Sequence, residues 1–185
     1  MNSKPILIAH GEPNSVFLEI FFKSLKSKKI KNPLILVCSQ KLLKFQMKKL
    51  KFNMGIRILN RSSLNKIKLN NKTINIIDIK YNKDVKFNKI TSNSNDYIKN
   101  CFETSIEIIK SGITNKFING PVSKKSFLKK KFLGITEYLT KMNSVKQSAM
   151  LIYNKKLSVC PITTHLPLKL VVKNITRKKL RKKYI

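Results

Sequence analysis

The segment PILIAHGEPNSVFLEI, residues 5–20, predicts a buried strand, a tight turn and a helix in immediate succession. Residues 5–10 form a short apolar run, which is typical of a strand covered on both faces. Turn-forming residues follow at 11–15, and from Val16 to Leu25 the apolar side chains recur at helical spacing, with Ser15 as a candidate N-cap. This order of elements is the unit from which parallel α/β sheets are built.

The same alternation continues along the chain. Further strands are expected at residues 34–38, 55–59, 73–79 and 116–119. Helices are expected at residues 40–50, 96–110, 124–131, 136–142 and from 168 onward, ending in a basic segment. Residues 149–153 and 157–163 read as two strands of a hairpin that turns at Asn154–Lys155. The pattern predicts one α/β layered fold with a mostly parallel sheet.

The composition is strongly basic. The chain has 185 residues and a formal net charge of +32 at pH 7, from 40 Lys and Arg against 8 Asp and Glu. Two interpretations stay open: a site for polyanions such as nucleic acid, or a solvated surface rich in the Lys, Asn and Ile that AT-rich coding favours. Because very few of the basic residues are Arg, the second is favoured, and only non-specific binding to nucleic acid in low salt is expected.

The chain is expected to be a cytoplasmic protein. It has no run of about 18 apolar residues that could span a membrane, and its N-terminus lacks the pattern of a signal peptide. Three widely spaced cysteines, Cys38, Cys101 and Cys160, sit in apolar segments and are interpreted as buried, reduced thiols.

Three short motifs could bind a ligand or simply form turns. GEPNS, residues 11–15, and NGPVSKK, residues 119–125, each follow an expected strand, and ligands of open α/β sheets bind at the carboxyl ends of strands. Ser123 and Lys124 could meet an anion at the start of the next helix. In GITEYL, residues 134–139, Thr136 and Glu137 suit a helix start. A turn or a cap explains each motif as well as a ligand does.

A fourth motif contains one of the two histidines, His165, in CPITTHLPLKL, residues 160–170. A lone histidine is most often structural or exposed. A metal site needs three or more ligands, and no CxxC, HExxH or HxH spacing occurs in the sequence.

Taken together, GEPNSVFLEI, FINGPVSKKSF, GITEYL and CPITTHLPLKLV resemble successive motifs of the 4-hydroxythreonine-4-phosphate dehydrogenase family. The family patterns are G-[DE]-P-A-G-I-G-P-E, T-G-P-x-x-K, G-H-T-E and T-T-H-L-P-L, and the last is matched residue for residue at Thr163–Leu168. The resemblance covers residues 1–185 and corresponds to the N-terminal part of the family's chain.

This resemblance implies a fold and an activity. The fold is a three-layer α/β/α architecture like that of isopropylmalate dehydrogenase, here incomplete at the C-terminus, in a homodimer. The reaction is oxidation of 4-phosphooxy-L-threonine, a phosphorylated amino acid, by NAD or NADP. Loss of carbon dioxide then gives 3-amino-2-oxopropyl phosphate for vitamin B6 (pyridoxal phosphate). A divalent metal such as Zn, Mg, Mn or Co is held by three histidines and polarises the reacting oxygen.

By the same resemblance, His165 matches the first metal-binding histidine and Thr136 a substrate-binding threonine. Ile135 stands where the family has a substrate-binding histidine, so that contact is lost or replaced. The other two metal histidines, the remaining substrate residues and most of the cofactor site lie beyond the chain. We therefore expect activity only with a complementing polypeptide. The alternatives are a basic nucleic-acid-binding protein or an inactive, decayed fragment.

Overall fold

The computed structural model describes residues 4–27, 30–83, 90–129, 131–145, 148–163 and 166–184. The chain divides into two compact units, residues 1–129 and 130–185. No helix within the described ranges is both long and apolar enough to cross a membrane.

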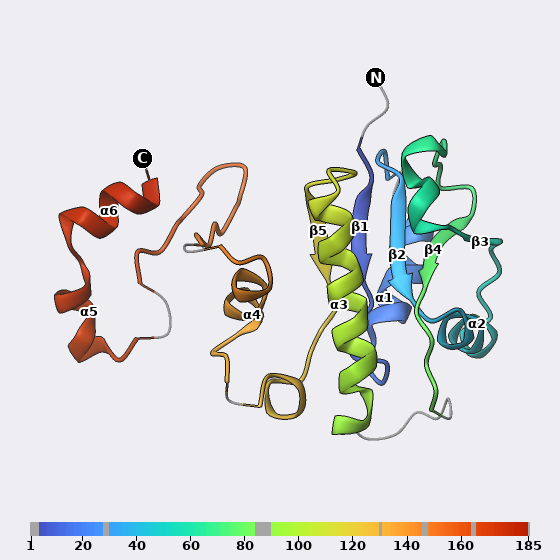
Figure 1. Cartoon of the computed structure of the whole chain (residues 1–185), viewed down its shortest axis with the longest axis horizontal. Helices are drawn as coiled ribbons and strands as arrows, with labels where there is room; N and C mark the ends of the chain where they lie inside the picture. Colours follow the sequence, from blue (N-terminus) through green and yellow to red (C-terminus); the bar gives the residue numbers. More distant parts are fainter. Residues whose placement is uncertain are drawn as a thin grey trace. The chain divides into compact units, whose positions relative to one another are not determined.

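Unit 1 is built on a parallel sheet of five strands in the order β3-β4-β2-β1-β5 (Figure 1). In chain order the strands are β1 (Ile6–Ala9), β2 (Leu34–Cys38), β3 (Ile56–Ile58), β4 (Ile74–Asp78) and β5 (Lys116–Asn119). Each pair of neighbours runs parallel. The five strands expected from the apolar runs are all confirmed, to within about two residues at each end.

Helices cover both faces of this sheet (Figure 1). On one face lie α1 (Phe17–Ser27) and α2 (Gln40–Lys49), and on the other lies α3 (Asn95–Lys110). Alternate residues of each strand point to opposite faces, so Ile8 and Leu36 join a core with Leu18, Phe22 and other side chains of the α1–α2 layer. The expected α/β/α layering is thereby confirmed.

Short turns of helix complete unit 1: η1 (Arg61–Lys66), η2 (Ser92–Ser94) and η3 (Lys124–Leu128), the last a single π-helical turn. Ser15 supplies a capping hydrogen bond at the start of α1, whereas Ser94, the residue before α3, does not cap its helix. The Ser15 hydroxyl accepts from the Phe17 N–H at 3.3 Å and donates to the Glu12 carbonyl at 2.7 Å. Ser94 precedes α3, but its side chain makes no capping hydrogen bond.

Unit 2 contains the helices α4 (Ile135–Met142), α5 (Leu168–Asn174) and α6 (Arg177–Tyr184). The helix expected from residue 168 onward is divided into two, α5 and α6, by a break at residues 175–176. The hairpin expected over residues 149–163 is confirmed only in its antiparallel pairing, because the two segments do not form extended strands. A single antiparallel bridge joins Ile152 and Val159: the Ile152 N–H donates to the Val159 carbonyl at 2.8 Å, and the Val159 N–H donates to the Ile152 carbonyl at 2.9 Å. Leu151 and Tyr153 are 62% and 72% exposed, so this apolar run has no sheet to pack on among the described residues of unit 2.

Candidate functional site

The motifs after β1 and β5 meet at the carboxyl edge of the sheet. β1 pairs with β2 on one side and with β5 on the other. The strands that follow β1 in the sequence therefore lie on both sides of it in the sheet. The Gly120 N–H donates to the Ala9 carbonyl at 2.7 Å, and the Glu12 N–H donates to the Pro121 carbonyl at 2.8 Å. GEPNS and NGPVSKK therefore form one structure at the point where open α/β sheets bind ligands.

The glycines of both motifs are required by this close approach. A Cβ on Gly120 would lie 1.9 Å from the His10 carbonyl oxygen. A Cβ on Gly11 would lie 2.5 Å from the Pro121 carbonyl oxygen, and Gly11 also has a φ of +75°. The two backbones pack with no room for a side chain at either position, which is a structural reason for both glycines.

Glu12 is buried beneath the turn that it begins. Its side chain is held by the Asn14 N–H, which donates to Oε1 at 3.2 Å, and Oε2 has no hydrogen-bond partner within the described part of the chain. Burial raises the pKa of the Glu12 carboxyl, and the Asn14 N–H and the Ser94 side chain act in the opposite direction. At 1% exposure this carboxyl does not face a ligand from solvent.

His10 lies in the interior between the sheet and α3. Its Nδ1 is hydrogen-bonded to the Tyr97 hydroxyl at 2.8 Å, and that hydroxyl also accepts from the Ser39 N–H at 3.0 Å. Burial lowers the pKa of His10 from 6.5 to about 3, so the imidazole stays neutral. Sequence reasoning missed Tyr97, although its position four residues before Cys101 on the apolar face of α3 was a usable signal.

The anion site considered at Ser123 and Lys124 finds no support in the geometry. The Ser123 hydroxyl accepts from the Ser126 N–H at 3.1 Å and so caps η3, which is only one turn long. This side chain serves the turn, as the simpler interpretation of NGPVSKK has it.

Unit 2 carries the other predicted site residues. Ile135 and Thr136 are the first two residues of α4, and both are half-buried. Thr136 and Glu137 lie in the first turn of α4, which confirms the expected helix start, and Gly134 occupies the N-cap position without a side-chain capping hydrogen bond. Glu137 Oε2 is buried without a hydrogen-bond partner among the described residues. His165, with Thr164, lies outside the described residues, so its predicted role as a metal ligand stays a prediction.

The described residues do not form a metal site. Within those ranges, no three His, Cys, Asp or Glu side chains come together in a group that could hold an ion. His10 is unsuitable because its ring is completely buried in the core and hydrogen-bonded to Tyr97. The divalent metal implied by the sequence resemblance therefore has no ligand set in this part of the chain.

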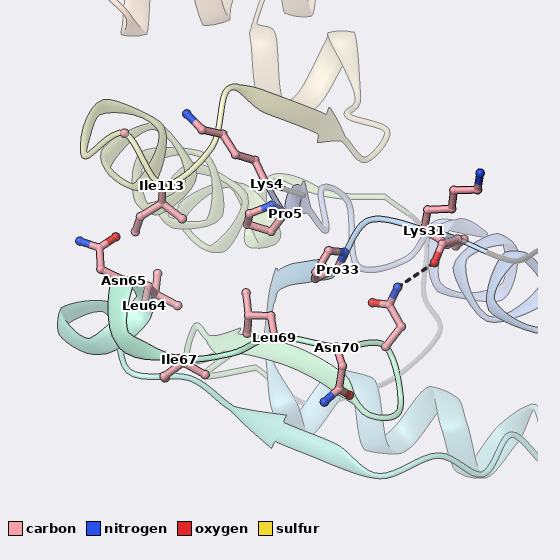
Figure 2. A pocket seen from close by; sticks show the side chains of 13 residues that line it. Lys4, Pro5, Lys31, Pro33, Leu64, Asn65, Ile67, Leu69, Asn70 and Ile113 are labelled. Carbon is pink, nitrogen blue, oxygen red and sulfur yellow. Dashed lines mark hydrogen bonds between the residues drawn. The ribbon is translucent and has the colours of Figure 1, made fainter. Parts of the chain in front are cut away.

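A pocket of about 570 Å³ lies at the opposite, amino edge of the sheet (Figure 2). Its lining includes Pro5, Pro33 and Ile113, which come before β1, β2 and β5 respectively. Asn71 also lines the pocket, and its side chain is engaged with the backbone: it accepts from the Leu34 N–H and donates to the Ile30 carbonyl. The predicted motifs do not contribute to this pocket.

The chain is similar to proteins of known families over almost its whole length. Residues 29–185 match the family model described as "Pyridoxal phosphate biosynthetic protein PdxA". The chain is 28% identical over 178 residues to the 4-hydroxythreonine-4-phosphate dehydrogenase of Sulfurihydrogenibium sp. (strain YO3AOP1), covering 95% of this chain and 54% of that protein. It is 23% identical over 175 residues to the D-threonate 4-phosphate dehydrogenase of Salmonella typhimurium, covering 91% and 53%.

Solved structures show the same fold. The chain superposes with a TM-score of 0.84 and 21% identity on a 4-hydroxythreonine-4-phosphate dehydrogenase from Burkholderia phymatum, covering 98% of this chain and 56% of that one. A Klebsiella pneumoniae protein of the same name gives a TM-score of 0.82 at 22% identity. The chain spans about half the length of the curated relatives it matches. Since the family model covers residues 29–185, this chain belongs to the PdxA family of pyridoxal phosphate biosynthetic proteins.

Proposed function

We propose that residues 1–185 are the N-terminal part of an NAD(P)-dependent dehydrogenase that makes pyridoxal phosphate precursors. The reaction is oxidation of 4-phosphooxy-L-threonine and loss of its carboxylate as carbon dioxide, which yields 3-amino-2-oxopropyl phosphate. The observation that carries this proposal is the family match, which runs through the three later motifs to residue 185. The meeting of GEPNS and NGPVSKK at the carboxyl edge supports it.

The proposed substrate contacts lie at the start of α4. Thr136, the second residue of the helix, has a hydroxyl that can donate to a substrate oxygen. Ile135 has no donor or acceptor in its side chain, so the phosphate or hydroxyl that a histidine would bind there must be held by another group. A substrate with a different pattern of oxygens, such as the D-threonate 4-phosphate of the Salmonella relative's name, is the second candidate that this substitution favours.

The metal and the hydride acceptor are proposed to bind largely outside the described residues. His165 would give a divalent ion one imidazole, and the remaining ligands would come from the part of the relatives that this chain does not span. A divalent metal supplies polarisation of a hydroxyl or carbonyl oxygen when bound. NAD or NADP supplies the hydride acceptor. The turn after β1 has a single glycine, Gly11, and so does not offer the Gly-rich phosphate cradle of dinucleotide folds.

In this proposal the site is complete only in a homodimer or with a complementing chain. The protein is proposed to act in the cytoplasm. Binding of nucleic acid remains a prediction from the net charge of +32 alone.

A turnover assay tests the function. Residues 1–185 are mixed with 4-phosphooxy-L-threonine or D-threonate 4-phosphate, NAD or NADP, and a divalent metal. The assay is run with and without a complementary polypeptide, defined as the part of the Sulfurihydrogenibium relative that this chain does not span. We expect reduction of the cofactor only in the complete mixture, abolished by His165→Ala and strengthened by Ile135→His.

The control pairs the same complementary polypeptide with the matching half of its own protein. If that pair turns over and the mixture with residues 1–185 does not, with either substrate, the proposed function is refuted.

A further inference from the structure

The end of β5 contains the single Asn-Gly pair of the sequence, Asn119–Gly120. Asn119 is the last residue of β5, which lies beside β1 in the sheet (Figure 1). The family pattern T-G-P-x-x-K has threonine at this position, so the asparagine is a departure from that pattern. Threonine has no side-chain amide, whereas an asparagine that precedes a glycine has the amide group that spontaneous deamidation requires.

Deamidation of this pair requires the backbone nitrogen of Gly120 to reach the side chain of Asn119. The nitrogen attacks Cγ of Asn119, the Cγ–Nδ2 bond breaks, and the proton of the Gly120 N–H leaves with Nδ2 as ammonia. Addition of water to the resulting cyclic imide gives aspartate or, with the peptide bond moved to the side-chain carboxyl group, isoaspartate. Glycine favours the attack because it has no side chain to hinder the backbone rotation that brings the two groups together.

The folded chain holds the Gly120 nitrogen away from this reaction. We call the packing of residues 9–12 on residues 119–121 the β1–β5 contact. In this contact the Gly120 N–H donates to the Ala9 carbonyl at 2.7 Å, so its proton is engaged and the nitrogen faces β1. The Gly120 α-carbon is tightly packed, since a Cβ would lie 1.9 Å from the His10 carbonyl oxygen. The Asn119 amide is engaged as well, because Nδ2 donates to the Gly120 carbonyl at 3.1 Å.

We propose that Asn119–Gly120 is a deamidation site, which the β1–β5 contact keeps closed and which opening of that contact exposes. The packing that requires a glycine at position 120 thus also restrains the reactivity that a glycine brings. Isoaspartate adds a methylene group to the main chain immediately before the Gly120 N–H, and so displaces its hydrogen bond to Ala9. Aspartate replaces the Nδ2 donor by an oxygen that cannot donate to the Gly120 carbonyl when ionised. A modified chain therefore cannot rebuild the contact, whatever reaction the protein catalyses.

Mass spectrometry of tryptic peptides measures the reaction. The purified chain is incubated in mildly alkaline buffer with and without guanidinium chloride, and the peptide of residues 117–124, whose only asparagine is Asn119, is followed over time. We expect conversion to be at least about tenfold slower in the folded chain, because the reaction requires the contact to open. Equal rates in the two conditions, or no conversion in guanidinium chloride, would overturn the proposal.

Two glycine variants test whether the β1–β5 contact provides the protection. A Cβ on Gly11 would lie 2.5 Å from the Pro121 carbonyl oxygen, so Gly11→Ala opens the contact without altering Asn119–Gly120. Gly55→Ala is the control, because a Cβ there would meet only the Thr73 methyl group at 3.2 Å. Without denaturant we expect Gly11→Ala to speed conversion at least about tenfold and Gly55→Ala less than about fivefold. Similar rates in the two variants would assign the protection to another part of the fold and overturn the proposal.

Refolding of the incubated chain tests the consequence of the modification. Chain that has been partly converted in guanidinium chloride is diluted into buffer, and the refolded fraction is separated from the rest by size-exclusion chromatography. We expect the modified form of the 117–124 peptide to be concentrated in the fraction that does not refold. Equal proportions of modified peptide in both fractions would show that the modified chain rebuilds the contact, which contradicts the proposal.

Discussion

Substitution of Gly120 by alanine should destabilise unit 1 by opening the contact between β1 and β5. The added Cβ would lie 1.9 Å from the His10 carbonyl oxygen and 2.9 Å from that of Ala9. Both are backbone atoms of a buried strand end, so no flexible side chain can move aside. The distance to the His10 carbonyl oxygen is about 1 Å shorter than 3.0 Å, the closest separation that real Cβ atoms show.

The expected cost follows from what must move. Separating the two strand ends lengthens the hydrogen bond from the Gly120 N–H to the Ala9 carbonyl and strains the one from the Glu12 N–H to the Pro121 carbonyl. Each is worth about 1 kcal/mol, and forcing a carbon into a packed interior costs about 1–3 kcal/mol. We expect a loss of about 3 kcal/mol in the free energy of unfolding, which is a large part of the roughly 5–15 kcal/mol of a typical domain.

Urea unfolding of the purified chain, followed by far-ultraviolet circular dichroism, measures this loss. Gly55→Ala is the matched control, because a Cβ there would meet only the Thr73 methyl group at 3.2 Å. Its effect should stay within about 1 kcal/mol in either direction. A Gly120→Ala variant as stable as the Gly55→Ala variant would refute the claim that the strand ends lie this close.

Three further predictions concern buried groups and surface charge. The pKa of His10 is about 3 in the folded chain and 6.5 in the unfolded chain, so below pH 6.5 the unfolded state binds a proton that the folded state does not. The free energy of unfolding should therefore fall by up to about 1.4 kcal/mol per pH unit between pH 6.5 and pH 3, and should not depend on His10 above pH 6.5. The raised pKa of Glu12 makes its own contribution change with pH in the opposite direction. The free energy of unfolding in urea is therefore measured against pH for the chain and for His10→Gln. If the two show the same dependence on pH, the prediction is contradicted. Burial raises the pKa of Cys101 to about 12 and that of Cys38 well above its usual value, so iodoacetamide should alkylate neither at neutral pH until urea is added, as mass spectrometry can show. Binding of random duplex DNA should fade by physiological salt, and its persistence in a titration would favour a dedicated nucleic-acid site.

The sheet was predictable because its local signals agree with its tertiary environment. Leu34–Cys38 is apolar at every position, and every residue of β2 is buried, as a central parallel strand requires. The run at residues 149–163 has similar local signals and forms one bridge. The difference is the partner: β2 lies between two strands, whereas a two-stranded hairpin without further packing is marginal in water.

The contacts that build the candidate site could not be predicted from the sequence. Gly11 and Gly120 are marked as turn residues by their neighbours, but their contact joins segments more than a hundred residues apart, which no local pattern reveals. The burial of His10 was hidden for the same reason, because Tyr97 approaches it from α3. The resemblance that assigns roles to Ile135, Thr136 and His165 carries chemical information that periodicity does not.

The ionisable groups at the carboxyl edge indicate what this edge can contribute to a reaction. His10 is neutral and fully buried, and Glu12 is buried with a raised pKa, so neither offers a proton donor or acceptor to a ligand in solvent. What the edge provides is a rigid junction of two strand ends, fixed by backbone hydrogen bonds and by glycines that tolerate no side chain. In the proposed enzyme this junction positions the chain, and the groups that bind substrate and accept hydride lie elsewhere, with Thr136 as the proposed substrate contact. If Glu12→Gln raises the activation free energy of the reaction by more than it lowers the free energy of unfolding, this division of roles is wrong.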